Sequence, residues 1–175
     1  MRRLLLLRHA KAERSQPGGH DRDRILAERG RADAAKIGAF LVRHRLTPDR
    51  ALVSPAARTR ETWELARAAF KKTVPVDFEP SLYEAEPDAI LATIQTADPS
   101  AHTLLVIGHN PGLQQLAATL IATGDVETRQ RLLEDYPTSA LAAMTFASDG
   151  WDGVHPHGGR LEHFVTPKWL EAPTA

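Results

Sequence analysis

The sequence predicts an α/β fold, a three-layer α/β/α sandwich around a mainly parallel sheet, with residues 1–175 forming one domain. Short apolar segments of strand length alternate with longer segments of helical apolar spacing, which favours a parallel sheet with helices on both faces. Two strand segments, residues 4–7 and 104–107, are apolar throughout, as strands buried on both faces are. The 175 residues, 42% of them hydrophobic, suit one domain with a substantial core.

The first half of the chain predicts two strand–helix pairs. They are a strand at residues 3–7, a helix at 28–44, a strand at 51–53 and a helix from 54 to about 70. The polar residues 10–24 predict a surface loop. The Arg and Lys residues of the first helix predict a solvated face opposite its apolar one. Ser54 as N-cap and Pro55 as first helical residue are the signals that start the second helix.

The second half of the chain predicts four more strands and three more helices. The predicted strands are residues 75–78, 103–107, 140–147 and 160–165. One predicted helix begins at residue 87, and the other two cover residues 112–123 and 126–136. Leu113, Leu116 and Leu120 give the helix at 112–123 its apolar face. Because a turn-rich segment joins the last two strands, we expect them to form an antiparallel hairpin.

The composition excludes several classes of protein. Lys and Arg together number 22 and so do Asp and Glu, so no overall charge favours nucleic acid or an anionic membrane as a partner. Without cysteine, disulfides, zinc thiolates and thiol catalysis are excluded. The first apolar run ends at Leu7, too early for a signal peptide, and no stretch approaches the roughly 18 apolar residues of a membrane span. We therefore expect a soluble, cytoplasmic protein.

Four side chains follow the ends of three predicted strands. Arg8 and His9 end the first strand, Arg58 lies in the first turn of the helix after the second, and His109 follows the strand at 103–107. In an open α/β sheet, ligands bind in the crevice beyond the carboxyl ends of the strands. We therefore expect these four side chains to meet in that crevice.

Two arginines and two imidazoles around one point make a pocket for a phosphate dianion. Arginine binds phosphate oxygens in a bidentate way, and a helix N-terminus offers further N–H donors. A cation such as Arg58 is disfavoured in a first helical turn, which suggests an anion nearby. A neutral imidazole is a good nucleophile near pH 7 and can accept a phosphoryl group. No metal is needed if the arginines stabilise the transferred charge.

Three motifs in this chain resemble those of the histidine phosphatase superfamily, which includes the phosphoglycerate mutases. The motifs are Leu7-Arg8-His9-Ala10, Ser54-Pro55-Ala56-Ala57-Arg58 and Gly108-His109-Asn110-Pro111. Arg-His-Ala in place of Arg-His-Gly, Leu82-Tyr83-Glu84-Ala85 and Tyr136-Pro137-Thr138 are most similar to the short SixA-type phosphohistidine phosphatases. The resemblance covers nearly the whole chain. It implies a phosphoglycerate mutase-like fold, His9 as phosphorylated nucleophile, Arg8, Arg58 and His109 as phosphate ligands, and no cofactor.

The general acid is left open by the sequence. The mutases place a glutamate after the third strand as proton donor, and Glu84 is the nearest candidate, with Glu86 and Asp88 as others. Alcohol leaving groups need such an acid, whereas a phosphohistidine whose imidazole is protonated needs it less. We therefore expect a phosphohistidine in a signalling or phosphotransfer protein as the substrate. A small phosphoester metabolite is the alternative, and a catalytically silent phosphate-binding module is a third hypothesis.

Other conspicuous residues have simpler interpretations. His155 and His157 have no carboxylate or cysteine at metal-ligand spacing, so we interpret them as part of a solvated hairpin loop. Asp23 and Arg24 are expected to fix the loop near the pocket. Trp151 and Trp169 are expected to be packing residues rather than a ligand cage.

Overall fold

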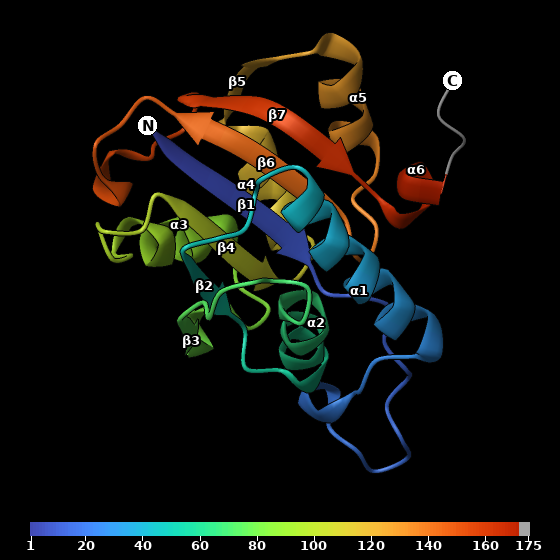
Figure 1. The fold of residues 1–175 in the computed structure, drawn as a ribbon. Coiled ribbons are helices and arrows are strands. Elements are labelled where there is room, and N and C mark those ends of the chain that lie inside the picture. Colours follow the sequence, from blue (N-terminus) through green and yellow to red (C-terminus); the bar gives the residue numbers. More distant parts are fainter. Residues whose placement is uncertain (172–175) are drawn as a thin grey trace.

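A seven-stranded mixed sheet runs through the middle of the protein, with helices on both faces (Figure 1). The computed structural model describes residues 1–171. Its strands are β1 (Arg2–Arg8), β2 (Arg50–Val53), β3 (Val76–Phe78), β4 (Thr103–Gly108), β5 (Ile121–Gly124), β6 (Leu141–Phe146) and β7 (Gly159–Val165). Its α-helices are α1 (Glu28–Arg43), α2 (Ala57–Arg67), α3 (Pro87–Gln95), α4 (Gly112–Leu120), α5 (Val126–Glu134) and α6 (Pro167–Glu171). No helix in this range is both long and apolar enough to cross a membrane.

The strand order explains where the site lies. The strands follow the order β3-β2-β4-β1-β6-β7-β5, and the four strands from β3 to β1 are parallel. Strand β6 is antiparallel to both β1 and β7, which confirms the predicted hairpin. Because β1, β2 and β4 are parallel neighbours, their carboxyl ends meet at one edge of the sheet.

Successive side chains of β1 point to opposite faces of the sheet and contribute to two hydrophobic clusters, one on each face. Leu4 and Leu6 belong to the cluster that includes apolar residues of α3, α4 and α5. Leu5 and Leu7 belong to the opposite cluster, with apolar residues of α1 and α2. All four leucines are fully buried, because helices cover each face of this strand. The predicted three-layer arrangement is therefore confirmed (Figure 1).

The predicted start of α2 is wrong. The helix begins at Ala57, its N-cap is Ala56, and no side chain caps it. Ser54 instead directs its hydroxyl to His109, with 2.7 Å between Oγ and Nε2. The hydroxyl of Ser54, predicted to cap the helix, is therefore bonded to the buried imidazole of His109. The helix also ends at Arg67, earlier than predicted.

Strand β5 was not predicted from the sequence. Helix α4 ends at Leu120, and the next residues, expected to continue the helix, form a strand parallel to β7. Ile121 and Thr123 are β-branched and suit a strand. The edge of β7 offers free backbone groups to this segment, and this tertiary pairing overrides its helical periodicity.

Candidate active site

A polar cavity of about 280 Å³ lies at the carboxyl ends of β1 and β4. Its wall contains all five site residues predicted from the sequence, namely Arg8, His9, Arg58, Glu84 and His109. Lys11, Asp21 and Arg24 also line it, so the wall carries the cationic side chains of Arg8, Lys11, Arg24 and Arg58 and the carboxylates of Asp21 and Glu84. The cationic groups outnumber the carboxylates, so the cavity favours an anion.

The rings of His9 and His109 lie side by side, as the sequence predicted. Their centroids are 5.4 Å apart and their planes are inclined by 54°. The register of the sheet produces this, because Arg8 of β1 pairs with Gly108 of β4 and each histidine is the next residue. Two imidazoles 100 positions apart in the chain thus reach the same cavity.

His9 is held in one tautomer. Its Nδ1 lies 2.8 Å from the carbonyl oxygen of Ala10. Because a carbonyl only accepts hydrogen bonds, Nδ1 carries the proton of the neutral ring and Nε2 carries the lone pair. Burial lowers the pKa of His9 to about 4, and the charges of Arg58 and Arg8 add to this shift against the opposing bond to Ala10. The ring is therefore neutral at pH 7.

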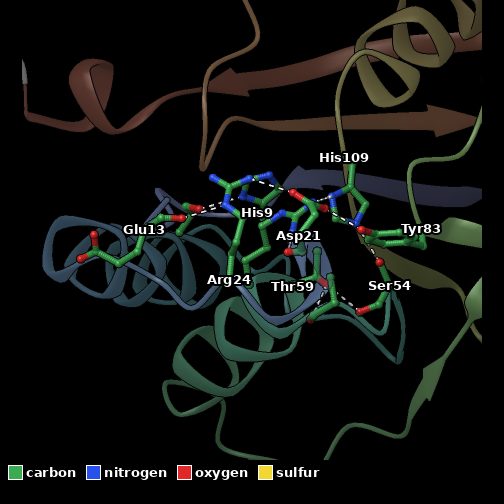
Figure 2. A network of polar contacts seen from close by, with 11 residues as sticks. His9, Glu13, Asp21, Arg24, Ser54, Thr59, Tyr83 and His109 are labelled. Carbon is green, nitrogen blue, oxygen red and sulfur yellow. Dashed lines mark hydrogen bonds and ion pairs between the residues drawn. The ribbon is translucent and has the colours of Figure 1, made fainter. Parts of the chain in front are cut away.

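His109 is held by a hydrogen bond on each ring nitrogen (Figure 2). Nη2 of Arg58 lies 3.3 Å from Nδ1, and since a guanidinium only donates, Nδ1 is the acceptor. Nε2 then donates to the hydroxyl of Ser54. Burial is the largest cause that lowers the pKa of His109 to about 3, and repulsion from Arg58 and from the protonated form of His9 adds to the shift. The second imidazole is neutral as well.

Arg58 is buried, Arg8 is half-buried, and both are only partly paired. Arg8 donates from Nη1 to the carbonyl oxygen of Tyr136 at 3.0 Å, and burial lowers the pKa of its guanidinium. Arg58, 3% exposed, donates from Nη1 and Nη2 to the backbone and side chain of Asp21. The Nε atoms of both arginines are buried without a hydrogen-bond partner among residues 1–171. Such groups are costly to bury unless an anion satisfies them.

Sequence reasoning missed Asp21 and Tyr83. The carboxylate of Asp21 accepts hydrogen bonds from Arg58 Nη2 at 3.0 Å, from Tyr83 Oη at 2.5 Å and from Arg24 Nη1 at 3.1 Å (Figure 2). The bond from Tyr83 is the largest cause of a pKa of Asp21 far below the ordinary value. Arg24 fixes the loop as predicted, since it also donates to the carbonyl oxygen of Glu13. The carboxylate in this network is Asp21 rather than the expected Asp23.

No simple sequence signal separated Asp21 from Asp23. Both lie in one short 3₁₀ helix, Asp21–Asp23, within a polar loop. Only the folded chain brings Asp21 to Arg58, whereas in the described part of the chain Asp23 makes no side-chain hydrogen bond or ion pair. The spacing of Asp21 three residues before Arg24 was the one available hint.

The three candidate general acids are separated by the structure. Glu84 lies in the cavity wall, exposed, with a backbone φ of 47°. Glu86 is the N-cap residue of α3 and Asp88 lies in its first turn, and both are exposed outside the cavity wall. Of the three candidates, only Glu84 therefore borders the cavity.

The remaining interpretations concern residues outside the cavity wall. His155 and His157 are exposed in the loop before β7, as predicted. Residues 1–171 hold no cluster of three or more His, Cys, Asp or Glu able to hold a metal ion. Trp151 is buried and donates from Nε1 to the carbonyl oxygen of Ala101, which confirms its packing role. Trp169 is instead 50% exposed, beside the guanidinium of Arg131.

Comparison with known proteins identifies the family. The model of the histidine phosphatase superfamily (branch 1) matches residues 4–90. The structure of a candidate phosphohistidine phosphatase SixA from Agrobacterium tumefaciens is 31% identical, with a TM-score of 0.78 over 95% of this chain and 99% of that one. The chain belongs to the histidine phosphatase superfamily.

This histidine phosphatase is of the SixA type. A second candidate SixA structure, from Nakamurella multipartitia, is 25% identical, with a TM-score of 0.81, and the match covers 95% of this chain and 96% of that one. An uncharacterized protein of Mycobacterium tuberculosis is 34% identical over 165 residues, which are 93% of this chain and 100% of that protein. Membership of the superfamily, together with the similarity to SixA structures, supports phosphatase activity for this protein.

Proposed function

We propose that this phosphatase removes phosphate from a phosphohistidine of a signalling or phosphotransfer protein, through a phosphoryl group carried on His9. One observation carries the proposal. The neutral ring of His9 is fixed by its bond to Ala10 with the lone pair on Nε2, inside a cavity lined by Arg8, Arg58 and His109. A nucleophile and the cations needed for the charge of a phosphoryl group are thus already in place.

The reaction takes two steps. Nε2 of His9 attacks phosphorus, and the bond from phosphorus to the substrate nitrogen breaks. When the other nitrogen of the substrate imidazole carries a proton, the leaving group is a neutral imidazole. Water then attacks phosphorus, the bond to Nε2 breaks, and inorganic phosphate and neutral His9 are formed. Arg8 and Arg58 stabilise the charge on the phosphoryl oxygens in both steps.

The hydrogen bond to Ala10 favours the first step. Phosphorylation of Nε2 places positive charge on a ring that keeps its proton on Nδ1. The carbonyl oxygen of Ala10, 2.8 Å away, accepts from this N–H, and the bond strengthens as the ring becomes positive. The backbone is fixed as well, since the amide of Ser139 donates to the carbonyl oxygens of both Arg8 and His9.

The size of the cavity favours a phosphoryl group on a larger molecule. At about 280 Å³ it lies below the roughly 300–1,000 Å³ of pockets that enclose a whole small ligand. A phosphoryl group and the adjoining ring fit, while the remainder of the substrate lies outside. A histidine on a protein surface meets this condition.

A small phosphoester is the second candidate substrate, and the position of Glu84 favours it. This carboxyl group lies in the cavity wall, where it could protonate an alcohol leaving group. Comparison of the two substrate classes at equal concentration decides between them. A rate at least tenfold higher for phosphohistidine protein than for sugar or nucleotide phosphates supports the first proposal.

The test of the intermediate uses His9→Ala beside the wild-type enzyme. We expect the wild type to trap a phosphoryl group that is stable in alkali and labile in acid, as N-linked phosphate is, and His9→Ala to lose both labelling and turnover. His102→Ala, which changes an exposed histidine at the start of β4, is the matched control and should behave as wild type. Phosphate binding without turnover of any substrate would identify a silent binding module instead.

A further inference from the structure

The phosphoryl cavity contains a negative charge of its own. The carboxylate of Asp21 lies in its wall and accepts from Arg58 Nη2 at 3.0 Å, while the backbone oxygen of Asp21 accepts from Nη1 at 2.9 Å. Arg58 is thus engaged on both terminal nitrogens by one residue. An anion that enters the cavity must approach this carboxylate and share the same guanidinium.

Asp21 is well placed to hold the side chains around His109. Its carboxylate joins α2 through Arg58, the end of the turn before α3 through Tyr83, and its own loop through Arg24. The Tyr83 ring in turn packs edge-on against the His109 ring, with centroids 5.4 Å apart. Asp21 therefore acts on the site through Arg58 and Tyr83, as a positioning residue.

The same carboxylate opposes anion binding. It lies close enough to His109 for its charge to act on that imidazole, against the charges of Arg58 and Arg8. Its side chain remains 40% exposed, so its three hydrogen-bond partners do not enclose the carboxylate. Like charges at short range cost free energy in a partly desolvated site. The negative charge of Asp21 therefore compensates part of the positive charge of Arg58, and the attraction between Arg58 and a bound dianion is weaker.

We propose that Asp21 is a built-in counter-ion that holds Arg58 in place and weakens the binding of free phosphate, so that the product leaves the cavity. This inference rests on the proposed phosphatase function, because it concerns the product of that reaction. Catalysis gains from charge stabilisation that acts on the transition state, and tight binding of the free product only slows turnover. With its charge partly compensated by Asp21, Arg58 still supplies hydrogen-bond donors to the phosphoryl group but binds the free phosphate product less tightly.

A purely structural role predicts the opposite sign. If Asp21 only fixes Arg58, Asp21→Asn loosens the guanidinium and phosphate binds more weakly. If Asp21 also offsets the charge of Arg58, the loss of one negative charge outweighs this loosening, because the backbone bond from Arg58 to residue 21 remains, and phosphate binds more tightly. We expect an affinity increase of about tenfold, which corresponds to about 1.4 kcal/mol.

The experiment measures the affinity for inorganic phosphate by calorimetry, in the absence of any substrate. The variants are Asp21→Asn and Asp21→Ala, with Asp23→Asn as the matched control, since Asp23 belongs to the same short helix and lies outside the cavity wall. Asp23→Asn should bind as wild type. Asp21→Glu, which keeps the charge, should restore weak binding. The increase should shrink at high salt, where charges are screened.

The outcomes separate this inference from the proposed function. The counter-ion proposal is overturned if the affinity for phosphate is unchanged or lower in Asp21→Asn or Asp21→Ala, whichever of the two folds. An increase in Asp23→Asn as large as in Asp21→Asn also overturns it, because the effect then reflects the charge of the whole loop. Since the measurement needs no turnover, a failure of the phosphohistidine proposal appears only in the substrate comparison.

Discussion

The Nε2 atom of His109 lies 2.7 Å from the hydroxyl oxygen of Ser54. This contact joins the end of β2 to the end of β4, and both residues are buried. It leaves Nδ1 of the same ring as the acceptor of the Arg58 guanidinium. The orientation of the second imidazole is therefore fixed by a serine that sequence signals assigned to a helix cap.

Removal of the Ser54 hydroxyl should impair the site without unfolding the protein. In Ser54→Ala the ring loses the partner of its Nε2–H, and the buried donor stays unpaired at a cost of about 1–3 kcal/mol. We expect kcat/KM to fall about tenfold or more, measured by steady-state kinetics. Ser81→Ala, which removes an exposed serine hydroxyl bonded to Thr93, is the control and should leave the rate unchanged. A wild-type rate in Ser54→Ala would show that the tautomer of His109 is unimportant.

Loss of the Arg58 guanidinium should weaken both anion binding and turnover. Arg58→Ala removes the donors that stabilise phosphoryl charge, and we expect kcat/KM to fall by about 10²–10³. Vanadate, a phosphate analogue, should bind at least about tenfold more weakly, as measured by inhibition. Arg60→Ala is a matched control on the same helix, since its guanidinium lies over the ring of Phe78 outside the cavity wall. Equal losses in the two variants would contradict a specific role for Arg58.

Substitution of Glu84 should separate the two substrate classes. Glu84→Gln removes the one of the three candidate general acids, Glu84, Glu86 and Asp88, that lies in the cavity wall. Hydrolysis of alkyl phosphates should fall about 10²-fold, because the alkoxide leaving group needs a proton. Hydrolysis of phosphohistidine should change less than about threefold, because its leaving imidazole is neutral when the ring is protonated. Glu86→Gln is the control, and equal losses on both substrates would mean that Glu84 does not act as the acid.

The two buried imidazoles should make the fold less stable in acid. The folded pKa values of His9 and His109, about 4 and about 3, lie below the ordinary 6.5. Between these limits the unfolded chain binds protons that the folded chain does not, so the free energy of unfolding decreases as pH falls below about 6.5. His9 alone accounts for on the order of 3 kcal/mol once pH reaches about 4.

Urea unfolding at several pH values between about 7 and 5 measures this slope. The double variant His9→Asn, His109→Asn should lose most of it, and the partly buried His163, whose pKa is also lowered, supplies the remainder. Asp21 does not contribute in this window, because the stability from its lowered pKa is lost only below about pH 4. If the free energy of unfolding of the double variant depends on pH as steeply as that of the wild type, His9 and His109 are not the source of the acid sensitivity.

The sequence by itself determined the layers of the fold and four of the site residues. The uninterrupted apolar run of β1 required burial on both faces, and that requirement is local to the strand. Arg8 ends β1, His9 and His109 directly follow β1 and β4, and Arg58 lies in the first turn of the helix after β2. The rule that the carboxyl ends of parallel strands meet at one edge was therefore enough to bring them together. The register of β1 and β4 fixes the backbone positions of Arg8, His9 and His109, and the start of α2 fixes that of Arg58.

Only the tertiary structure decided how these groups are charged and held. The bond from His109 to Ser54 and the pairing of Arg58 with Asp21 join residues 55 and 37 positions apart, and neither belongs to a repeating pattern. The choice of Asp21 over Asp23, and of a strand over a helix at β5, depended on partners supplied by the rest of the chain. Periodicity reports which face of an element is buried, whereas a single polar contact depends on the distance between two atoms, which the folded chain alone sets.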